Sequence, residues 1–266
     1  MSAMISALAR TAAVTAAGLL GVFHSVAAAK EAPTTTLHVF AASSLTESFT
    51  EIAKLFEKDH PHTKVELNFA GTPMLRTQIE QGAPADVFAS ADLVHSEALQ
   101  KQELLLNTTI FARNKLVIAA SAKSDKVSSI ADLAKPKTKI VVADQTVPVG
   151  RYAMEVLRKI SAANIAGDNF LAQVEQNLVS REANVRAVLS KVVLGEADAG
   201  FVYRTDAITA GKKIRILEIP DSLNAIADYP IGVLAHSATP PLAKDFVALV
   251  VSEKGKAIVK EHGFLP

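Results

Sequence analysis

The chain has 266 residues, 28 lysines and arginines against 27 acidic residues, 49% hydrophobic residues and no cysteine. Because there is no cysteine, a disulfide framework, a thiol nucleophile and a cysteine-linked lipid anchor are excluded. The near-neutral charge also argues against nucleic acid and anionic membrane surfaces as partners, since both attract proteins through a basic field.

The first 29 residues are typical of a secretory signal peptide. Arg10 is followed by a run of apolar and small residues from Thr11 to Phe23, and then by three alanines that end at Ala29. The apolar run has about 13 residues, whereas a membrane-spanning helix needs about 20. We therefore expect cleavage after Ala29, export to the periplasm and no membrane insertion. An uncleaved N-terminal anchor is the alternative.

The segment from Leu37 to Pro61 predicts a buried strand, a turn of small residues and an amphipathic helix. Ser44 and Glu47 have the S-x-x-E spacing of a capping box, which gives Ser44 a structural role. The alternative is that this helix N-terminus, with unpaired amides and a partial positive charge, binds an anion. The apolar positions that recur at helical spacing are Phe49, Ile52, Ala53 and Phe56.

The rest of the chain alternates between strand and helix patterns. Strands are predicted over residues 64–69, 86–89, 114–120, 139–143, 199–203 and 229–234. Helices are predicted from residue 73, over 92–100 and 128–133, after 150, after 184, and within 246–251 and 256–260. Thr72 stands where an N-cap belongs, and Pro73 stands at a first helical position that needs no amide donor.

This alternation predicts an α/β fold with mostly parallel sheets, arranged as one large domain or two lobes. In open sheets of this kind, ligands bind outside the carboxyl ends of the strands. Short turns at these ends offer hydroxyls and backbone amides but few charged side chains. Such neutral donors suit the reversible binding of a fully ionised oxyanion, and no metal is required. The hydroxyl-bearing residues are Ser43, Ser44, Thr72, Thr146 and Tyr203.

Five segments carry a more specific signal, in order along essentially the whole mature chain. They are FAASSLTESF, FAGTPMLRTQIEQGAPADVFASAD, ADQTVPVGRYA, EANVRAVLSKVVLGEADAGFVYRTDA and the closing GFLP. These segments resemble the periplasmic molybdate-binding protein (ModA) family of ABC transporters. The most specific pieces are QIEQGAPADVFASAD and GEADAGFVYRTDA.

The resemblance implies a two-lobed periplasmic-binding-protein fold of type II, with the ligand cleft between the lobes. It implies that residues 34–112 plus 232–266 form one lobe and that residues 113–231 form the other. The two chain crossings near Arg113 and Ile231 would form a hinge, and the lobes would close on the ligand as rigid bodies.

Carried over by position, the resemblance also implies a binding site. The hydroxyls assigned to the oxyanion are those of Ser44, Thr72 and Tyr203, and the main-chain amides are those of Val149 and Val185. Molybdate would bind as an oxyanion through these residues, with no direct metal ligands. The chain departs from the family pattern at Gly71-Thr72-Pro73, because threonine adds a methyl group where the family has serine and proline removes an amide donor.

The implied function is the capture of molybdate, and also of tungstate, by a monomeric binding protein that delivers it to the membrane subunits of an ABC permease. No cofactor and no enzyme activity are expected. Two alternatives stay open, namely a binding protein for another tetrahedral oxyanion such as sulfate and an enzyme on the same scaffold. The chain shows no nucleophile paired with a base, no G-x-S-x-G motif and no paired carboxylates at the turns, which argues against an enzyme.

Overall fold

The computed structural model describes residues 34–266, and the predicted signal peptide, residues 1–29, lies outside the described residues. The strands of the described part are β1 (Thr35–Ala42), β2 (Thr63–Ala70), β3 (Val87–Ala89), β4 (Leu105–Ser121), β5 (Ile140–Ala143), β6 (Leu178–Glu182), β7 (Ala199–Tyr203), β8 (Ile214–Glu218) and β9 (Ile226–Leu234). Its α-helices are α1 (Thr46–Asp59), α2 (Thr72–Glu80), α3 (Leu93–Lys101), α4 (Pro148–Ala162), α5 (Phe170–Gln176), α6 (Val185–Leu194), α7 (Arg204–Ala210), α8 (Pro240–Val251) and α9 (Glu253–Glu261). Its 3-10 helices are η1 (Ser43–Leu45), η2 (Ile130–Ala134) and η3 (Gly211–Lys213).

The described strands form one sheet in the order β2-β1-β3-β9-β4-β7-β5-β6, and β8 also pairs with β4. β1 is parallel to β2 and β3, and β5 is parallel to β6 and β7. The 17-residue strand β4 connects these two parallel groups, because its first part pairs with β9 and its last part pairs with β7 and β8. The pairings of β4 and β9 are antiparallel. The sheet is therefore mixed, which corrects the prediction of mostly parallel sheets.

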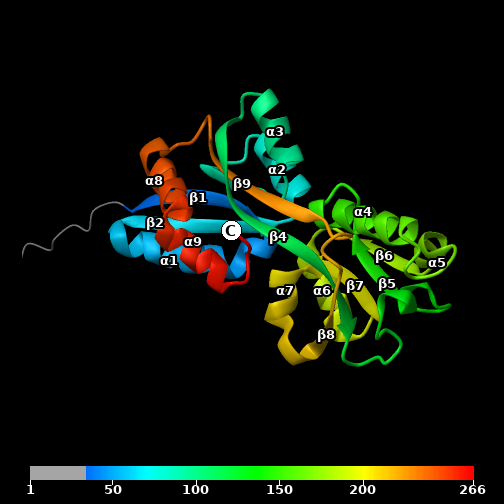
Figure 1. The fold of residues 1–266 in the computed structure, drawn as a ribbon. Helices are drawn as coiled ribbons and strands as arrows, with labels where there is room; N and C mark the ends of the chain where they lie inside the picture. The colour runs from blue at the N-terminus through cyan, green and yellow to red at the C-terminus, as the bar shows by residue number, and fades with distance from the viewer. Residues whose placement is uncertain (1–33) are drawn as a thin grey trace, which may run out of the picture. The chain divides into compact units, whose positions relative to one another are not determined.

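The helices cover the sheet in separate groups (Figure 1). α1, α8 and α9 pack against one another, and α2 packs against α3. α4 and α6 pack against β5 and β7, and α7 packs against the last part of β4 and against β7. The apolar stripes predicted from helical spacing are the buried faces of these helices, as in α1, where Phe49, Ile52, Ala53 and Phe56 are buried.

The register of β1 and β2 places two predicted turns side by side. Ala42, the last residue of β1, lies opposite Ala70, the last residue of β2. Because the two strands are parallel, the chain leaves both at the same edge, first into η1 and then into α2. The hydroxyls predicted after these strands are therefore neighbours.

The parallel strands β5 and β6 place the starts of α4 and α6 side by side in the same way. Ala143 at the end of β5 lies opposite Glu182 at the end of β6, and the turns that follow lead into α4 and α6. β7 runs parallel to β5 on its other side and ends at Tyr203. The carboxyl ends of all these strands carry the segments singled out from the sequence, where the ligands of open α/β sheets bind.

The sequence patterns do not predict the first part of β4, α5, β6, α7 or β8. β6 and β8 consist largely of exposed and half-buried residues, so they lack the apolar run of a buried strand. The helix predicted over residues 128–133 is the 3-10 helix η2, which keeps a capping box between Ser129 and Asp132. The lobe boundaries at residues 112 and 231 stay a prediction, since β4 and β9 continue through them as unbroken strands.

Candidate functional site

The five residues assigned to oxyanion binding line one small cavity; they are Ser44, Thr72, Val149, Val185 and Tyr203. The cavity lies between the turns that follow β1, β2, β5 and β6 and the carboxyl end of β7. None of the described residues that line it has a charged side chain. The volume open to the centre of a water molecule is about 10 Å³, which is roughly the space of a single water.

Two helix N-termini supply the backbone donors of the cavity. Val149 and Val185 stand in the first turns of α4 and α6, where amides have no acceptor within the helix. Pro148, the first residue of α4, has no amide hydrogen, so the Val149 amide is the first that this helix presents. In α6 the Asn184 side chain accepts a hydrogen bond from the Ala187 amide at 3.0 Å. This cap uses a later amide of the helix, so the Val185 amide stays available to a ligand. Both helices direct the positive ends of their dipoles at the cavity.

Thr72 contributes a hydroxyl whose oxygen already accepts a hydrogen bond. It is the first residue of α2, and Gly71 takes the N-cap position, which corrects the prediction that Thr72 caps this helix. The Gly71 carbonyl accepts the amides of Met74 and Leu75, so the helix begins one residue earlier than the side chain suggests. Thr72 Oγ1 instead accepts the Ala91 amide at 3.4 Å. This contact leaves the hydroxyl proton of Thr72 for another acceptor.

Ser44 does not form the expected capping box with Glu47. α1 begins at Thr46, after η1, and no side chain accepts a hydrogen bond at its N-terminus. The Ser44 hydroxyl lies 2.9 Å from the hydroxyl of Tyr229 on β9, and both side chains are buried. The capping role predicted for Ser44 is therefore wrong, because its hydroxyl turns to a partner far away in the chain.

Tyr203 brings a buried hydroxyl to the cavity. Its side chain is 1% exposed, and its hydroxyl has no hydrogen-bond partner among residues 34–266. Burial raises the pKa of this hydroxyl well above its ordinary value. Tyr203 therefore keeps its proton and is available as a hydrogen-bond donor. A buried unpaired hydroxyl is costly, so a ligand that accepts from it removes this cost.

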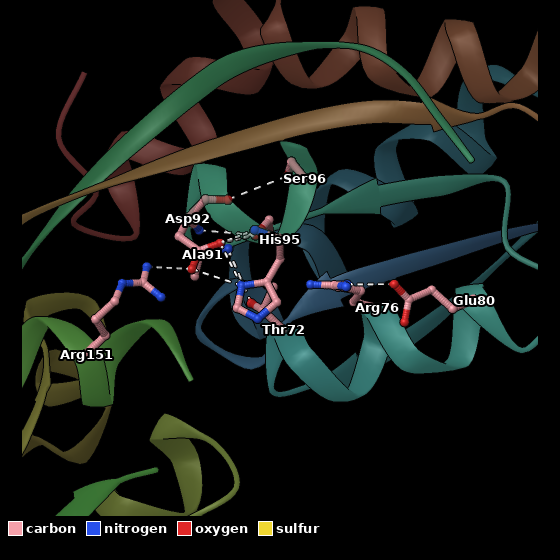
Figure 2. A network of polar contacts seen from close by, with 9 residues as sticks. Thr72, Arg76, Glu80, Ala91, Asp92, His95, Ser96 and Arg151 are labelled. Carbon is pink, nitrogen blue, oxygen red and sulfur yellow. Dashed lines mark hydrogen bonds and ion pairs between the residues drawn. The ribbon is translucent and has the colours of Figure 1, made fainter. Parts of the chain in front are cut away.

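Beside the cavity, Asp92 stands at the centre of a polar network (Figure 2). Its carboxylate accepts hydrogen bonds from the His95 amide at 3.0 Å and from Arg151 Nη2 at 2.6 Å, and it contacts His95 Nδ1 at 2.9 Å. Burial acts to raise the pKa of Asp92, but the bonds from His95 and Arg151 outweigh it, and the pKa is lowered. Asp92 is thus ionised and neutralises Arg151, which links α4 to the N-terminus of α3.

A second ionic link joins α6 to α1. The Arg186 guanidinium donates two hydrogen bonds to the Glu47 carboxylate. Its Nε also lies 2.6 Å from Asp206 Oδ1, as an ion pair that lacks the alignment of a hydrogen bond. Burial raises the pKa of Asp206 to about 7, against the lowering effect of Arg186. The pKa of Glu47 is lowered, so its ionised carboxylate already neutralises Arg186 and leaves no excess positive charge for a ligand.

The described residues offer no cluster suited to a metal ion. In residues 34–266, no group of three or more His, Cys, Asp or Glu side chains is arranged to hold one. In the same part of the chain, no helix is both long enough and apolar enough to cross a membrane. The donors that converge on the cavity are instead neutral hydroxyls and amides.

Comparison with known proteins places the chain in a family. The family of bacterial extracellular solute-binding proteins matches residues 37–265. The chain belongs to this family. A curated relative is the molybdate-binding protein ModA of Mycobacterium tuberculosis, which is 39% identical over 228 residues, covering 85% of this chain and 83% of the relative.

Similar solved structures agree with this assignment. The substrate-binding domain of a putative molybdenum ABC transporter from Clostridium difficile is 33% identical with a TM-score of 0.64, covering 87% of this chain and 99% of that one. The periplasmic molybdate-binding protein of Azotobacter vinelandii is 25% identical with a TM-score of 0.75, covering 86% and 99%. The predicted fold class, a two-lobed periplasmic-binding-protein fold of type II, is confirmed.

Some residues around the cavity of this family member have no signal in the sequence. Tyr229 belongs to an ordinary strand pattern, and its contact with Ser44 spans 185 positions of the chain. Gly71 reads as a turn glycine, yet a methyl group there would overlap the carbonyl oxygen of Ala183 in the turn before α6. The roles of Tyr229 and Gly71 depend on contacts between segments that are distant in the chain, and local sequence patterns do not predict such contacts.

Proposed function

We propose that the chain is the solute-binding protein of an ABC importer and that it captures molybdate, and also tungstate, as an intact oxyanion. The observation that carries this proposal is the buried Tyr203 hydroxyl, which lacks a partner among the described residues and lies at a cavity lined by other neutral donors. Two similar proteins are named molybdate-binding proteins, which supports the choice of ligand. The ligand is cargo, so no cofactor and no catalysis are part of the proposal.

The binding energy that we expect comes from hydrogen bonds to a charged acceptor. Each such bond contributes about 1.5–3 kcal/mol. Five donors, on Ser44, Thr72, Val149, Val185 and Tyr203, would leave roughly micromolar affinity or tighter after the cost of association. Because the neighbouring arginines are paired with carboxylates, selectivity rests on the geometry of these donors.

The small volume of the cavity supports a cycle of opening and closing. A space of roughly one water is too small for a tetrahedral oxyanion with four oxygens, so the cavity must open to take one up and must close less far around it. We infer that residues 34–112 plus 232–266 separate from residues 113–231 by a hinge in β4 and β9, and close again on the ligand. The closed, monomeric protein, exported by a cleaved signal peptide to the periplasm, would then dock on its permease.

Isothermal titration of the mature protein, stripped of ligand, tests this function. Molybdate, tungstate, sulfate and phosphate are titrated in turn. We expect one-to-one binding of molybdate and tungstate, and no heat from sulfate or phosphate. Binding of sulfate without molybdate would support the alternative of another tetrahedral oxyanion and overturn the proposed ligand.

Thr72 offers a matched pair of substitutions. Thr72→Val keeps the shape of the side chain but removes the hydroxyl, so we expect the Kd for molybdate to rise about tenfold to a hundredfold. Thr72→Ser keeps the hydroxyl and should change the Kd by less than about threefold. Titration of both variants gives the answer, and equal affinities would remove Thr72 from the site.

The link between Arg186 and Glu47 should favour the closed form. Glu47→Gln weakens an ion pair between α6 and α1 that is partly exposed, so we expect a loss of about 1 kcal/mol and a Kd about fivefold higher. Glu253→Gln on α9 is the matched control, because its pair with Lys256 is exposed and lies within one helix. If both variants bind molybdate equally well, the link has no role in closure.

A further inference from the structure

The contact between Ser44 and Tyr229 raises the question of which hydroxyl donates. The two oxygens are 2.9 Å apart, and either can supply the proton. Ser44 lines the cavity, whereas Tyr229 does not. A fully ionised oxyanion has only acceptor atoms, so a hydroxyl that binds it must keep its own proton for the ligand. If Ser44 donated to Tyr229, it would face the ligand with a lone pair.

We propose that Tyr229 is a positioning residue for ligand binding, because its hydroxyl donates to Ser44 Oγ and thereby turns the Ser44 proton towards the cavity. This inference rests on the proposed function, since it assigns a direction to one donor of that site. It gives Tyr229, which does not touch the ligand, an influence on affinity that acts through Ser44.

The surroundings of Tyr229 hold its hydroxyl in one place. The side chain is fully buried, and its ring meets three aromatic rings edge-on or nearly so. Ring centroids lie 5.2 Å away for Phe264, 5.8 Å for Tyr203 and 6.4 Å for Phe111. Such edge-to-face contacts favour a fixed orientation of the ring. The hydroxyl at its end is therefore aimed at Ser44 before a ligand arrives.

The protonation of Tyr229 agrees with a donor role. Burial raises the pKa of its hydroxyl; the hydrogen bond with Ser44, and smaller effects of Asn114 and Tyr203, act in the opposite direction without overcoming it. Tyr229 therefore carries its proton throughout the physiological pH range. Thr72 also has a donor within the protein, since its Oγ1 accepts a hydrogen bond from the Ala91 amide at 3.4 Å. The hydroxyl oxygens of Ser44 and Thr72 thus each accept a hydrogen bond from the protein, and each hydroxyl keeps its own proton to donate to an oxyanion.

A double-mutant cycle on the full mature protein tests the proposal, with molybdate as the probe. We expect Tyr229→Phe to raise the Kd about fivefold to tenfold and Ser44→Ala about tenfold or more. The double variant Ser44→Ala with Tyr229→Phe should bind as Ser44→Ala does, because Tyr229 acts through the hydroxyl that is already gone. Thr50→Val is the control and should leave the Kd unchanged, because the Thr50 hydroxyl donates to the Thr46 carbonyl within α1 and does not line the cavity.

Several outcomes would overturn the inference. Additive effects in the cycle would mean that Tyr229 acts on packing, and an unchanged Kd in Tyr229→Phe would mean that it does not act at all. A wild-type protein that does not bind molybdate or tungstate would instead overturn the proposed function. Should Tyr229→Phe fail to fold, replacement of Tyr229 by 3-fluorotyrosine keeps the ring and makes the hydroxyl a stronger donor. Binding at least as tight as wild type then supports the proposal, and weaker binding refutes it.

Discussion

Gly71→Ala is expected to prevent tight ligand binding while the unliganded protein stays folded. Gly71 has φ −63° and ψ 138°, an ordinary extended conformation that alanine adopts without strain. The added methyl group would, however, overlap the backbone carbonyl oxygen of Ala183, which belongs to the turn before α6 on the other side of the cavity. The contact therefore opposes closure and leaves the local structure of either turn intact.

The expected loss is roughly a hundredfold in Kd, because overpacking costs about 1–3 kcal/mol and a backbone carbonyl has little freedom to move aside. Titration with molybdate gives the Kd, and thermal unfolding without ligand reports the folded state. Gly150→Ala is the contrasting variant, since a methyl group there would overlap carbonyl oxygens of Ala143 and Asp144 in its own turn. It should lower the melting temperature of the unliganded protein, as Gly71→Ala should not. Wild-type affinity in Gly71→Ala would refute this account of closure.

Sequence patterns predict the local features of this fold well. Helical spacing identifies the buried faces of α1, α4 and α6, because an amphipathic helix that packs on a sheet must bury its apolar stripe. The same patterns locate the turns at the carboxyl ends of β1, β2 and β5, since strand and helix periods change there, and they locate the start of α6. These features are local, and the resemblance to a known family then connects the turns to one site.

The hydroxyl assignments show where local reasoning ends. The S-x-x-E spacing predicts that Ser44 caps α1, but a buried hydroxyl takes the partner that the tertiary fold provides, here Tyr229. Thr72 likewise bonds the Ala91 amide and does not cap α2. The ion pair between Arg186 and Glu47 also joins residues far apart in the chain. No spacing in the sequence encodes such meetings between distant elements.

Tyr203→Phe should weaken molybdate binding about tenfold to a hundredfold, with no loss of stability in the unliganded protein. The hydroxyl is buried and has no hydrogen-bond partner among the described residues, so its removal breaks no hydrogen bond within that part of the free protein. In the complex it would donate to a charged oxygen, a bond that contributes about 1.5–3 kcal/mol. The substitution keeps the ring and its edge-on contact with Tyr229 at 5.8 Å.

Thermal unfolding with and without molybdate separates this role from a structural one. Without ligand, the melting temperature of Tyr203→Phe should equal or exceed that of the wild type, because a desolvated and unpaired hydroxyl is lost. With saturating molybdate it should fall below the wild type, since ligand stabilisation decreases as the Kd rises. A structural tyrosine would lower both melting temperatures, so a lower value without ligand would contradict the role of Tyr203 as a ligand donor.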